Sequence, residues 1–188
     1  MRPVDISEIK NIAEYELARP EWRPKIMALK DRRRIRVGEH MTFLFENHDT
    51  VLYQIQEMMR VERMVRAGEI ANEVSTYNEL IPGPRELSAS LLIEYEDATE
   101  RDRRLGELVG LERHIWFEVE GARSPSQCDD RQMSRDRLSA VQYVKFRLTD
   151  EQVTAFPQNA RLVIEHPQYR ADHVLTAEER AELARDFD

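Results

Sequence analysis

The residues of this chain best suited to chemistry gather between positions 37 and 63, where a strand-like run leads directly into an amphipathic helix. Carboxylates and amides placed against a core cost free energy unless they have partners, so polar residues on an apolar stripe need a reason. We therefore expect any functional site to lie in this segment. Its candidate residues are Glu46, Gln54, Glu57 and Glu62, with His40 as the nearest imidazole.

One interpretation of these residues is a metal site. Oxygen and imidazole ligands suit iron, manganese or zinc. The spacing of the helical carboxylates differs from the Glu-x-x-His pattern of di-iron bundles, and the chain has neither His-Glu-x-x-His nor a cysteine pair. The alternative is that the carboxylates pair with nearby arginines or with backbone groups. The proposed ligands are Glu46, Glu57, Glu62 and His40, and the competing arginines are Arg60, Arg63 and Arg66.

A second candidate is a short basic run before this segment, which could bind an anion or RNA. Residues 1–38 carry an excess of four positive charges, whereas the whole chain has a net charge of −8. The alternative is a structural role, in which cations at the C-terminal end of a helix complement its dipole. The acidic remainder of the chain disfavours general nucleic-acid binding. The residues of the run are Arg32, Arg33, Arg34 and Arg36.

General acid–base catalysis is a further option, because polar residues lie on several predicted strands and at strand ends. Polar residues that alternate along an antiparallel strand normally face solvent, which favours a passive role. The candidates are Glu94, Glu118, Tyr143, His114 and His166. Nucleophilic catalysis is disfavoured because the single cysteine, Cys128, lies in a polar stretch without a neighbouring histidine and reads as a loop thiol. Glycine-rich phosphate loops are absent.

The elements that must position these residues follow from the hydrophobic pattern. We predict an α+β fold with a mainly antiparallel sheet of about five or six strands packed with helices. Residues 1–188 would form a single domain, with a helical N-terminal segment over 1–36 that Pro20 and Pro24 break or restart, and a charged loop over 122–137. The predicted strands are 41–46, 87–96, 115–120, 139–148 and 161–166.

Cysteine usage and hydropathy indicate a compartment. A lone cysteine cannot form an intrachain disulfide, and no apolar stretch is long enough to span a membrane. The sequence therefore predicts a cytoplasmic protein without a membrane partner.

Several phrases of the chain resemble a bacterial family known as DUF3501, a domain of unknown function. The resemblance covers nearly the whole chain, and it brings no established activity. It implies a gene neighbourhood with rubrerythrin-like di-iron proteins and iron–sulfur proteins, and hence a role near iron or peroxide metabolism. The phrases are Phe-Leu-Phe-Glu-Asn (43–47), Tyr-Gln-Ile-Gln-Glu-Met (53–58), Leu-Ile-Pro-Gly-Pro (80–84), Leu-Ser-Ala-Ser-Leu (87–91), Ala-Val-Gln-Tyr-Val-Lys-Phe (140–146) and Glu-His-Pro-Gln-Tyr (165–169).

Three functions follow as hypotheses, and they leave open whether the protein is an enzyme. The first is an accessory protein of iron or redox metabolism that binds a rubrerythrin-like or iron–sulfur partner. The second is a metal-binding protein or metal-dependent enzyme that uses the Glu/His cluster within residues 40–62. The third is an anion- or RNA-binding module built on the arginine run. Polar residues on a helix stripe can also mark an oligomer seam, so the pattern is compatible with a homodimer.

Overall fold

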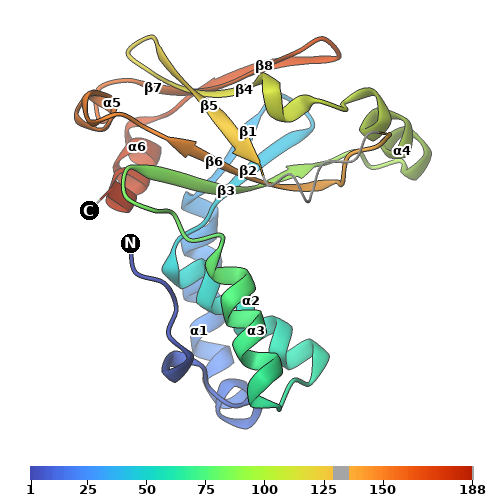
Figure 1. The fold of residues 1–188 in the computed structure, drawn as a ribbon, viewed down its shortest axis with the longest axis vertical. Helices are drawn as coiled ribbons and strands as arrows, with labels where there is room; N and C mark the ends of the chain where they lie inside the picture. Colours follow the sequence, from blue (N-terminus) through green and yellow to red (C-terminus); the bar gives the residue numbers. More distant parts are fainter. Residues whose placement is uncertain (129–135, 188) are drawn as a thin grey trace.

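The computed structural model describes residues 1–128 and 136–187. It combines one antiparallel sheet, curved into a nearly closed barrel, with helices that project from its side (Figure 1). The α-helices are α1 (Ile12–Arg32), α2 (His48–Glu62), α3 (Ala67–Asn78), α4 (Ala98–Glu107), α5 (Asp150–Ala155) and α6 (Ala177–Leu183). Short 3-10 helices are η1 (Ile6–Glu8), η2 (Leu111–His114) and η4 (Ala184–Phe187).

Eight strands form the sheet, in the order β1-β2-β3-β6-β5-β4-β7-β8, and every neighbouring pair is antiparallel. The α+β class and the antiparallel sheet are thus as predicted, whereas the predicted count of five or six strands is too low. The strands are β1 (Arg34–Val37), β2 (Met41–Phe45), β3 (Glu86–Ile93), β4 (Ile115–Val119), β5 (Ala122–Cys128), β6 (Val141–Arg147), β7 (Ala160–His166) and β8 (Tyr169–Val174).

The edge strands β1 and β8 lie side by side, which brings the sheet close to closure. The Tyr169 hydroxyl donates to the Val37 carbonyl at 2.8 Å and accepts from the His40 backbone N–H at 3.1 Å. Gly38 makes this contact possible, because a Cβ there would lie 2.4 Å from the Tyr169 hydroxyl and the residue has φ +70°. A tyrosine therefore joins the two edges.

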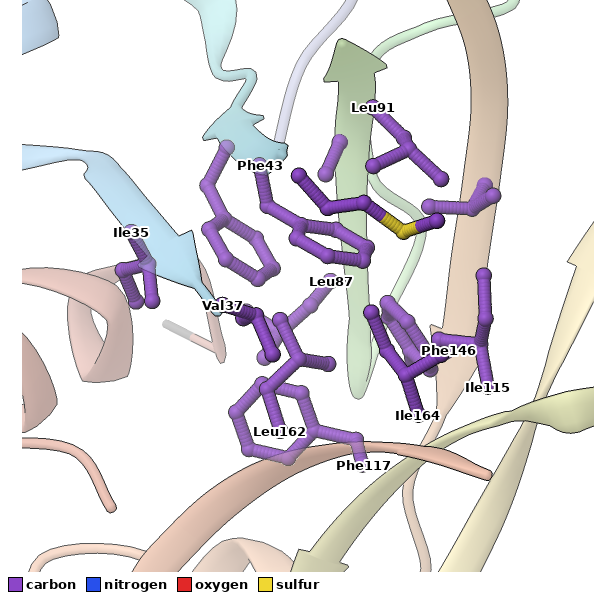
Figure 2. Packing of buried hydrophobic residues seen from close by; sticks show 14 of the residues in the cluster. Ile35, Val37, Phe43, Leu87, Leu91, Ile115, Phe117, Phe146, Leu162 and Ile164 are labelled. Atoms are coloured by element: carbon purple, nitrogen blue, oxygen red, sulfur yellow. The ribbon is translucent and has the colours of Figure 1, made fainter. Parts of the chain in front are cut away.

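The interior of the barrel is apolar. Aromatic and aliphatic side chains from neighbouring strands point toward one another there (Figure 2). The ring centroids of Phe117 and Phe146 lie 5.6 Å apart, and Phe117 stacks on Phe156 at 5.6 Å. Burial of these large rings, together with the aliphatic side chains around them, stabilises this half of the fold.

A second apolar cluster lies among the helices, where α2 packs between α1 and α3. The α1 helix is continuous through Pro20 and Pro24, so the predicted break is wrong. Both prolines are exposed, and the buried side chains of Tyr15 and Ile26 hold the helix on either side of them. These tertiary contacts offset the hydrogen bonds that the prolines cannot make. Within the described ranges, no helix combines the length and apolar character needed to cross a bilayer.

Three strands account for the low predicted count. The β1 strand follows α1 directly, within the segment assigned to an N-terminal helical region. The β5 strand occupies the first part of the predicted charged loop over 122–137, whereas 129–135 lie outside the described residues. The β8 strand is the outermost strand, with alternating half-buried and exposed residues. None of the three has the continuous apolar signal of a central strand, because each is short or carries many polar residues.

Candidate functional site

Two adjacent cavities lie between the helices and the outer face of the sheet. The outer cavity, of about 660 Å³, lies where α3 faces β3, β5 and β6. The inner cavity, of about 210 Å³, continues toward α1 and α2. Tyr77, Leu80 and Tyr143 line both. We call the two cavities together the groove.

The two-residue period of β3 places polar side chains in the groove. Leu87, Ala89 and Leu91 point into the barrel core, so Ser88 and Ser90 lie on the opposite face. Strand register sets Ser90 opposite Tyr143 on β6. The Leu-Ser-Ala-Ser-Leu phrase thus supplies an apolar inner face and a hydroxyl-bearing outer face.

Glu46 is the buried carboxylate of the inner cavity. It lies at the junction of β2 and α2, where Asn47 caps the helix by accepting from the Thr50 backbone N–H at 3.0 Å. The hydroxyls of Thr50 and Ser90 each donate to a different oxygen of Glu46, both at 2.6 Å. The carboxylate is therefore fixed in position, and each oxygen retains capacity for another hydrogen bond.

Lys30 enters the same cavity from the last turn of α1. Its side chain is half-buried, and its Nζ lies 5.4 Å from the centroid of the Tyr53 ring. Across residues 1–128 and 136–187, the side chain of Lys30 forms no ion pair and no hydrogen bond. Burial lowers the pKa of Lys30, and the nearby Glu46 carboxylate opposes that shift. Lys30 therefore loses its proton more readily than an exposed lysine does.

Tyrosines form the wall where the two cavities meet. Tyr77 is hydrogen-bonded to Gln54, and its pKa is raised chiefly by burial. The pKa of Tyr143 is raised by burial and by the Glu46 carboxylate. Both phenols are therefore neutral at physiological pH, so they offer aromatic surface and hydroxyl groups rather than charge.

Two side chains of the outer cavity could in principle be reactive, but Lys145 already has partners and Cys128 is a weakly reactive thiol. Lys145 forms an ion pair with Glu86 at 2.9 Å and donates to the Ile81 carbonyl at 3.3 Å. Cys128 lies at the end of β5, half-buried, rather than in a loop as predicted. Burial, with a smaller effect of Glu112, raises its pKa to about 11, so it is a thiol and a weak nucleophile near neutral pH.

The predicted metal ligands are not brought together. Glu46 lies in the groove, but Glu57 faces α1, where it accepts from the Tyr15 hydroxyl at 2.5 Å and pairs with Arg19 at 2.7 Å. Glu57 is therefore paired with an arginine, as the alternative interpretation held, although the arginine comes from another helix.

The other two predicted ligands are also remote from a common centre. Glu62 is exposed at the end of α2. His40 lies in the β1–β2 turn, where its ring stacks on Tyr95 with centroids 4.0 Å apart and its Nδ1 lies 3.1 Å from the Glu94 carbonyl oxygen. Among the residues that the structure describes, no group of three or more His, Cys, Asp or Glu side chains could hold a metal ion. The helical period separates the side chains that sequence proximity suggested as a cluster.

The arginine run is divided by the change from helix to strand. Arg33 is completely buried, where it pairs with Asp186 and with Glu182 at 3.4 Å and donates to the carbonyls of Phe45 at 2.9 Å and Glu46 at 3.2 Å. It is therefore not available to an external anion.

The other three arginines of the run are exposed. Arg32 pairs with Glu182 at 3.3 Å, and Arg34 lies 3.6 Å from Asp31. Arg36 donates to the Glu39 carbonyl at 2.5 Å. Two of these charges thus already face carboxylates, which weakens the case for one continuous anion site.

Of the acid–base candidates, Tyr143 lies in the groove and Glu118 does not. Glu118 pairs with Arg123 at 2.9 Å and Arg161 at 2.8 Å. The sequence interpretation found Glu46 and Gln54 but missed Lys30, Tyr77 and the serines of β3. The alternation of serine and leucine in β3 was the available signal, but the local pattern does not reveal that α3 faces the serine side of this strand.

Comparisons with known proteins agree with the sequence resemblance. The family model described as a protein of unknown function (DUF3501) matches residues 3–187. A crystal structure of a novel protein of unknown function from Burkholderia pseudomallei matches with a TM-score of 0.91 and 29% sequence identity, and the match covers 100% of both chains. No curated protein matches. The chain therefore belongs to the DUF3501 family of proteins of unknown function.

Proposed function

We propose that this protein binds a small amphipathic organic molecule in the groove. The observation that carries this proposal is that Lys30 and Glu46, which have opposite charges, line one cavity without an ion pair between them in the described part of the chain. Burying a charged group costs free energy, and within the described residues Lys30 has no carboxylate partner to offset that cost, whereas Glu46 is held by two hydroxyl groups. A bound molecule would supply the missing contacts.

The size and lining of the groove support a ligand of ordinary metabolite size. The outer cavity of about 660 Å³ falls within the range of about 300–1,000 Å³ typical of small-molecule sites. An apolar or aromatic body would lie against Tyr77, Leu80 and Tyr143, and its polar end would reach toward Lys30 and Glu46. This arrangement of an apolar wall with a few convergent polar groups is typical of binding sites.

The first experiment tests occupancy of the groove with a neutral fluorescent probe, N-phenyl-1-naphthylamine. We expect saturable binding of about one probe per chain in the wild type. Ser88→Trp places an indole in the groove and should abolish this binding. Ser75→Trp, on the exposed surface of α3, is the matched control and should leave binding unchanged. Equal binding by both variants, with intact circular dichroism spectra, would remove the proposal.

A second candidate function is the accessory role suggested by the family resemblance. It is favoured by exposed apolar side chains on the helical part of the molecule: Leu17 is 84% exposed, Val61 67% and Val65 76%. Exposed apolar residues that gather in one region can mark protein contacts. The expected partner is a rubrerythrin-like or iron–sulfur protein.

This accessory role is tested by sedimentation of the protein with a rubrerythrin-like protein from the same host. Complex formation that is lost in Leu17→Asp and kept in Val174→Asp, an exposed valine on β8, would support it. The same experiment on the protein alone reports whether it forms a homodimer. Separate sedimentation of both proteins would count against a direct partnership.

A further inference from the structure

We propose that Lys30 is a nucleophilic amine that forms a Schiff base with the carbonyl group of an aldehyde or ketone bound in the groove. This inference rests on the proposed ligand-binding function and names the chemical class of the ligand. It adds a covalent step to a site that could otherwise serve for binding alone.

The four lysines of the chain differ sharply in their surroundings. Lys10 and Lys25 are exposed, so their ammonium groups are solvated. Lys145 is held by Glu86 and by the Ile81 carbonyl. Lys30 alone among them is half-buried at a cavity wall and, within the described residues, free of ion pairs and hydrogen bonds.

Desolvation favours the free-base form of Lys30, against the pull of two carboxylates and of the Tyr53 ring, which stabilises the ammonium. Burial acts first and lowers the pKa of Lys30, and the positive charge of Arg34 acts in the same direction. The carboxylates of Glu46 and Glu57 oppose the shift without cancelling it. A lysine desolvated in this way is the usual form of an activated amine nucleophile.

Glu46 is suited to carry the protons of the reaction. Its two oxygens are held by the Thr50 and Ser90 hydroxyls at 2.6 Å, so the carboxylate keeps its position while it gains and loses a proton. It lines the cavity that Lys30 enters, which places an acid–base group beside the nucleophile.

The proposed step is balanced without an oxidant or reductant. The Lys30 ammonium gives a proton to Glu46, and the free nitrogen forms a bond to the carbonyl carbon. Proton transfer from nitrogen to oxygen gives a carbinolamine. Glu46 returns its proton to the new hydroxyl, the C–O bond breaks, and water leaves a protonated imine. One ammonium and one carbonyl thus give one iminium and one water.

A neutral carbonyl compound fits this cavity better than an anion does. The Glu46 carboxylate would repel a phosphate or carboxylate at the inner end, and the lowered pKa of Lys30 weakens the positive charge that an anion needs. The neutral walls of Tyr77 and Tyr143 suit an aromatic or apolar body. The geometry therefore favours an amphipathic aldehyde or ketone.

The test is reductive trapping with benzaldehyde and cyanoborohydride, followed by peptide mass spectrometry of the four lysines. At pH 7 we expect the folded wild type to gain a benzyl group on Lys30 severalfold faster than on Lys25, because burial lowers the pKa of Lys30 and so increases its free-amine fraction. The excess should disappear in denaturant, where all lysines are solvated. Equal rates on Lys30 and Lys25 in the folded protein would overturn the inference.

Two variants separate the covalent step from binding. Glu46→Gln should slow labelling of Lys30 and leave Lys25 unchanged, because the loss of the proton carrier outweighs the larger free-amine fraction that removal of the carboxylate gives Lys30. Lys30→Arg should abolish the fast label, whereas Lys25→Arg, the matched control, should keep it. Each variant is first shown to fold by its circular dichroism spectrum, and the comparison of Lys30 with Lys25 in the wild type needs no variant.

The failure of this inference is distinguishable from the failure of the groove itself. Binding of N-phenyl-1-naphthylamine that is lost in Ser88→Trp, together with equal labelling of Lys30 and Lys25, would retain the ligand site and overturn the Schiff base. Fast labelling of Lys30 that persists in Ser88→Trp would support the reactive amine and show that access does not run through the outer cavity. Slow labelling in that variant would show that the aldehyde reaches Lys30 through the outer cavity.

Discussion

Arg33 and Lys30 are two cations three residues apart in one segment of chain, the first fully buried and the second half-buried, and their surroundings differ completely. Arg33 is enclosed by two carboxylates and two backbone carbonyls. Lys30 lies at a cavity wall beside an aromatic ring and has no direct ion-pair partner among the described residues. Glu46 joins the two regions, because its carbonyl accepts from Arg33 and its carboxylate lines the cavity of Lys30.

The difference shows how a structural polar cluster is distinguished from a candidate site. A buried charge with all its partners in place fixes geometry and leaves nothing for a ligand. A half-buried charge without an ion-pair partner, at the wall of a cavity, remains available to a ligand. The contrast makes the first region a fixed support and the second a place for chemistry.

The largest expected effect is at Arg33 and the two carboxylates that pair with it. Arg33→Met leaves the buried carboxylates of Glu182 and Asp186 without their cation, and we expect a loss of about 3–5 kcal/mol in the free energy of unfolding. Arg34→Met, at an exposed neighbour, should change it by less than about 0.5 kcal/mol. Urea denaturation followed by circular dichroism measures both. Equal losses in the two variants would show that Arg33 is not specially supported.

A smaller effect is expected at Glu57, whose carboxylate already has hydrogen-bond partners in Arg19 and Tyr15. Glu57→Gln weakens the contacts to Arg19 and Tyr15 and should cost about 1–2 kcal/mol at pH 7. Glu62→Gln, at an exposed position on the same helix, is the control and should have almost no effect.

The contribution of Glu57 also has a defined pH dependence. The Arg19 guanidinium holds the pKa of Glu57 below its usual value of 4.5. Because the folded pKa is lowered, the stabilisation is complete above the unfolded pKa and is lost as the pH falls through the folded pKa. The stability difference between wild type and Glu57→Gln should therefore shrink below about pH 4.5. A difference that is constant down to pH 3 would contradict this assignment.

The smallest expected effect has the opposite sign and gives the sharpest comparison with Arg33. Lys30→Met removes a cation that is desolvated and unpaired, so we expect the free energy of unfolding to stay unchanged or to rise by up to about 1 kcal/mol. The loss of the contact with the Tyr53 ring limits the gain. Lys25→Met, at an exposed position on the same helix, is the control. A loss as large as that of Arg33→Met would make Lys30 a structural residue.

Local patterns in the sequence were sufficient for the elements with strong periodicity. The α2 helix and the central strands β3, β4, β6 and β7 have apolar stripes that determine both their type and their inner face. Glu46 was identified as a costly polar residue because it directly follows the apolar β2 strand, and the structure places it, with Gln54, at the inner cavity.

Long-range contacts explain what local patterns could not reveal. Arg33 is neutralised by Asp186, which lies 153 residues away in the chain. The cavity around Lys30 is lined by side chains from α1, α2, α3, β2, β3 and β6, which are distant from one another in sequence. The continuity of α1 through Pro20 and Pro24 likewise depends on packing rather than on propensity. Each of these features depends on contacts between residues that are distant in sequence, which the local hydrophobic pattern does not reveal.

The tyrosine contact between β1 and β8 bears on how this molecule behaves in crowded solution. A sheet with two open rims offers unpaired amides and carbonyls to which a strand of another molecule can add. Here the Tyr169 hydroxyl occupies one such carbonyl and one such amide at the seam, and Gly38 provides the space for it. Protection against edge-to-edge aggregation at this end of the seam thus depends on the Tyr169 phenol and on the absence of a side chain at Gly38.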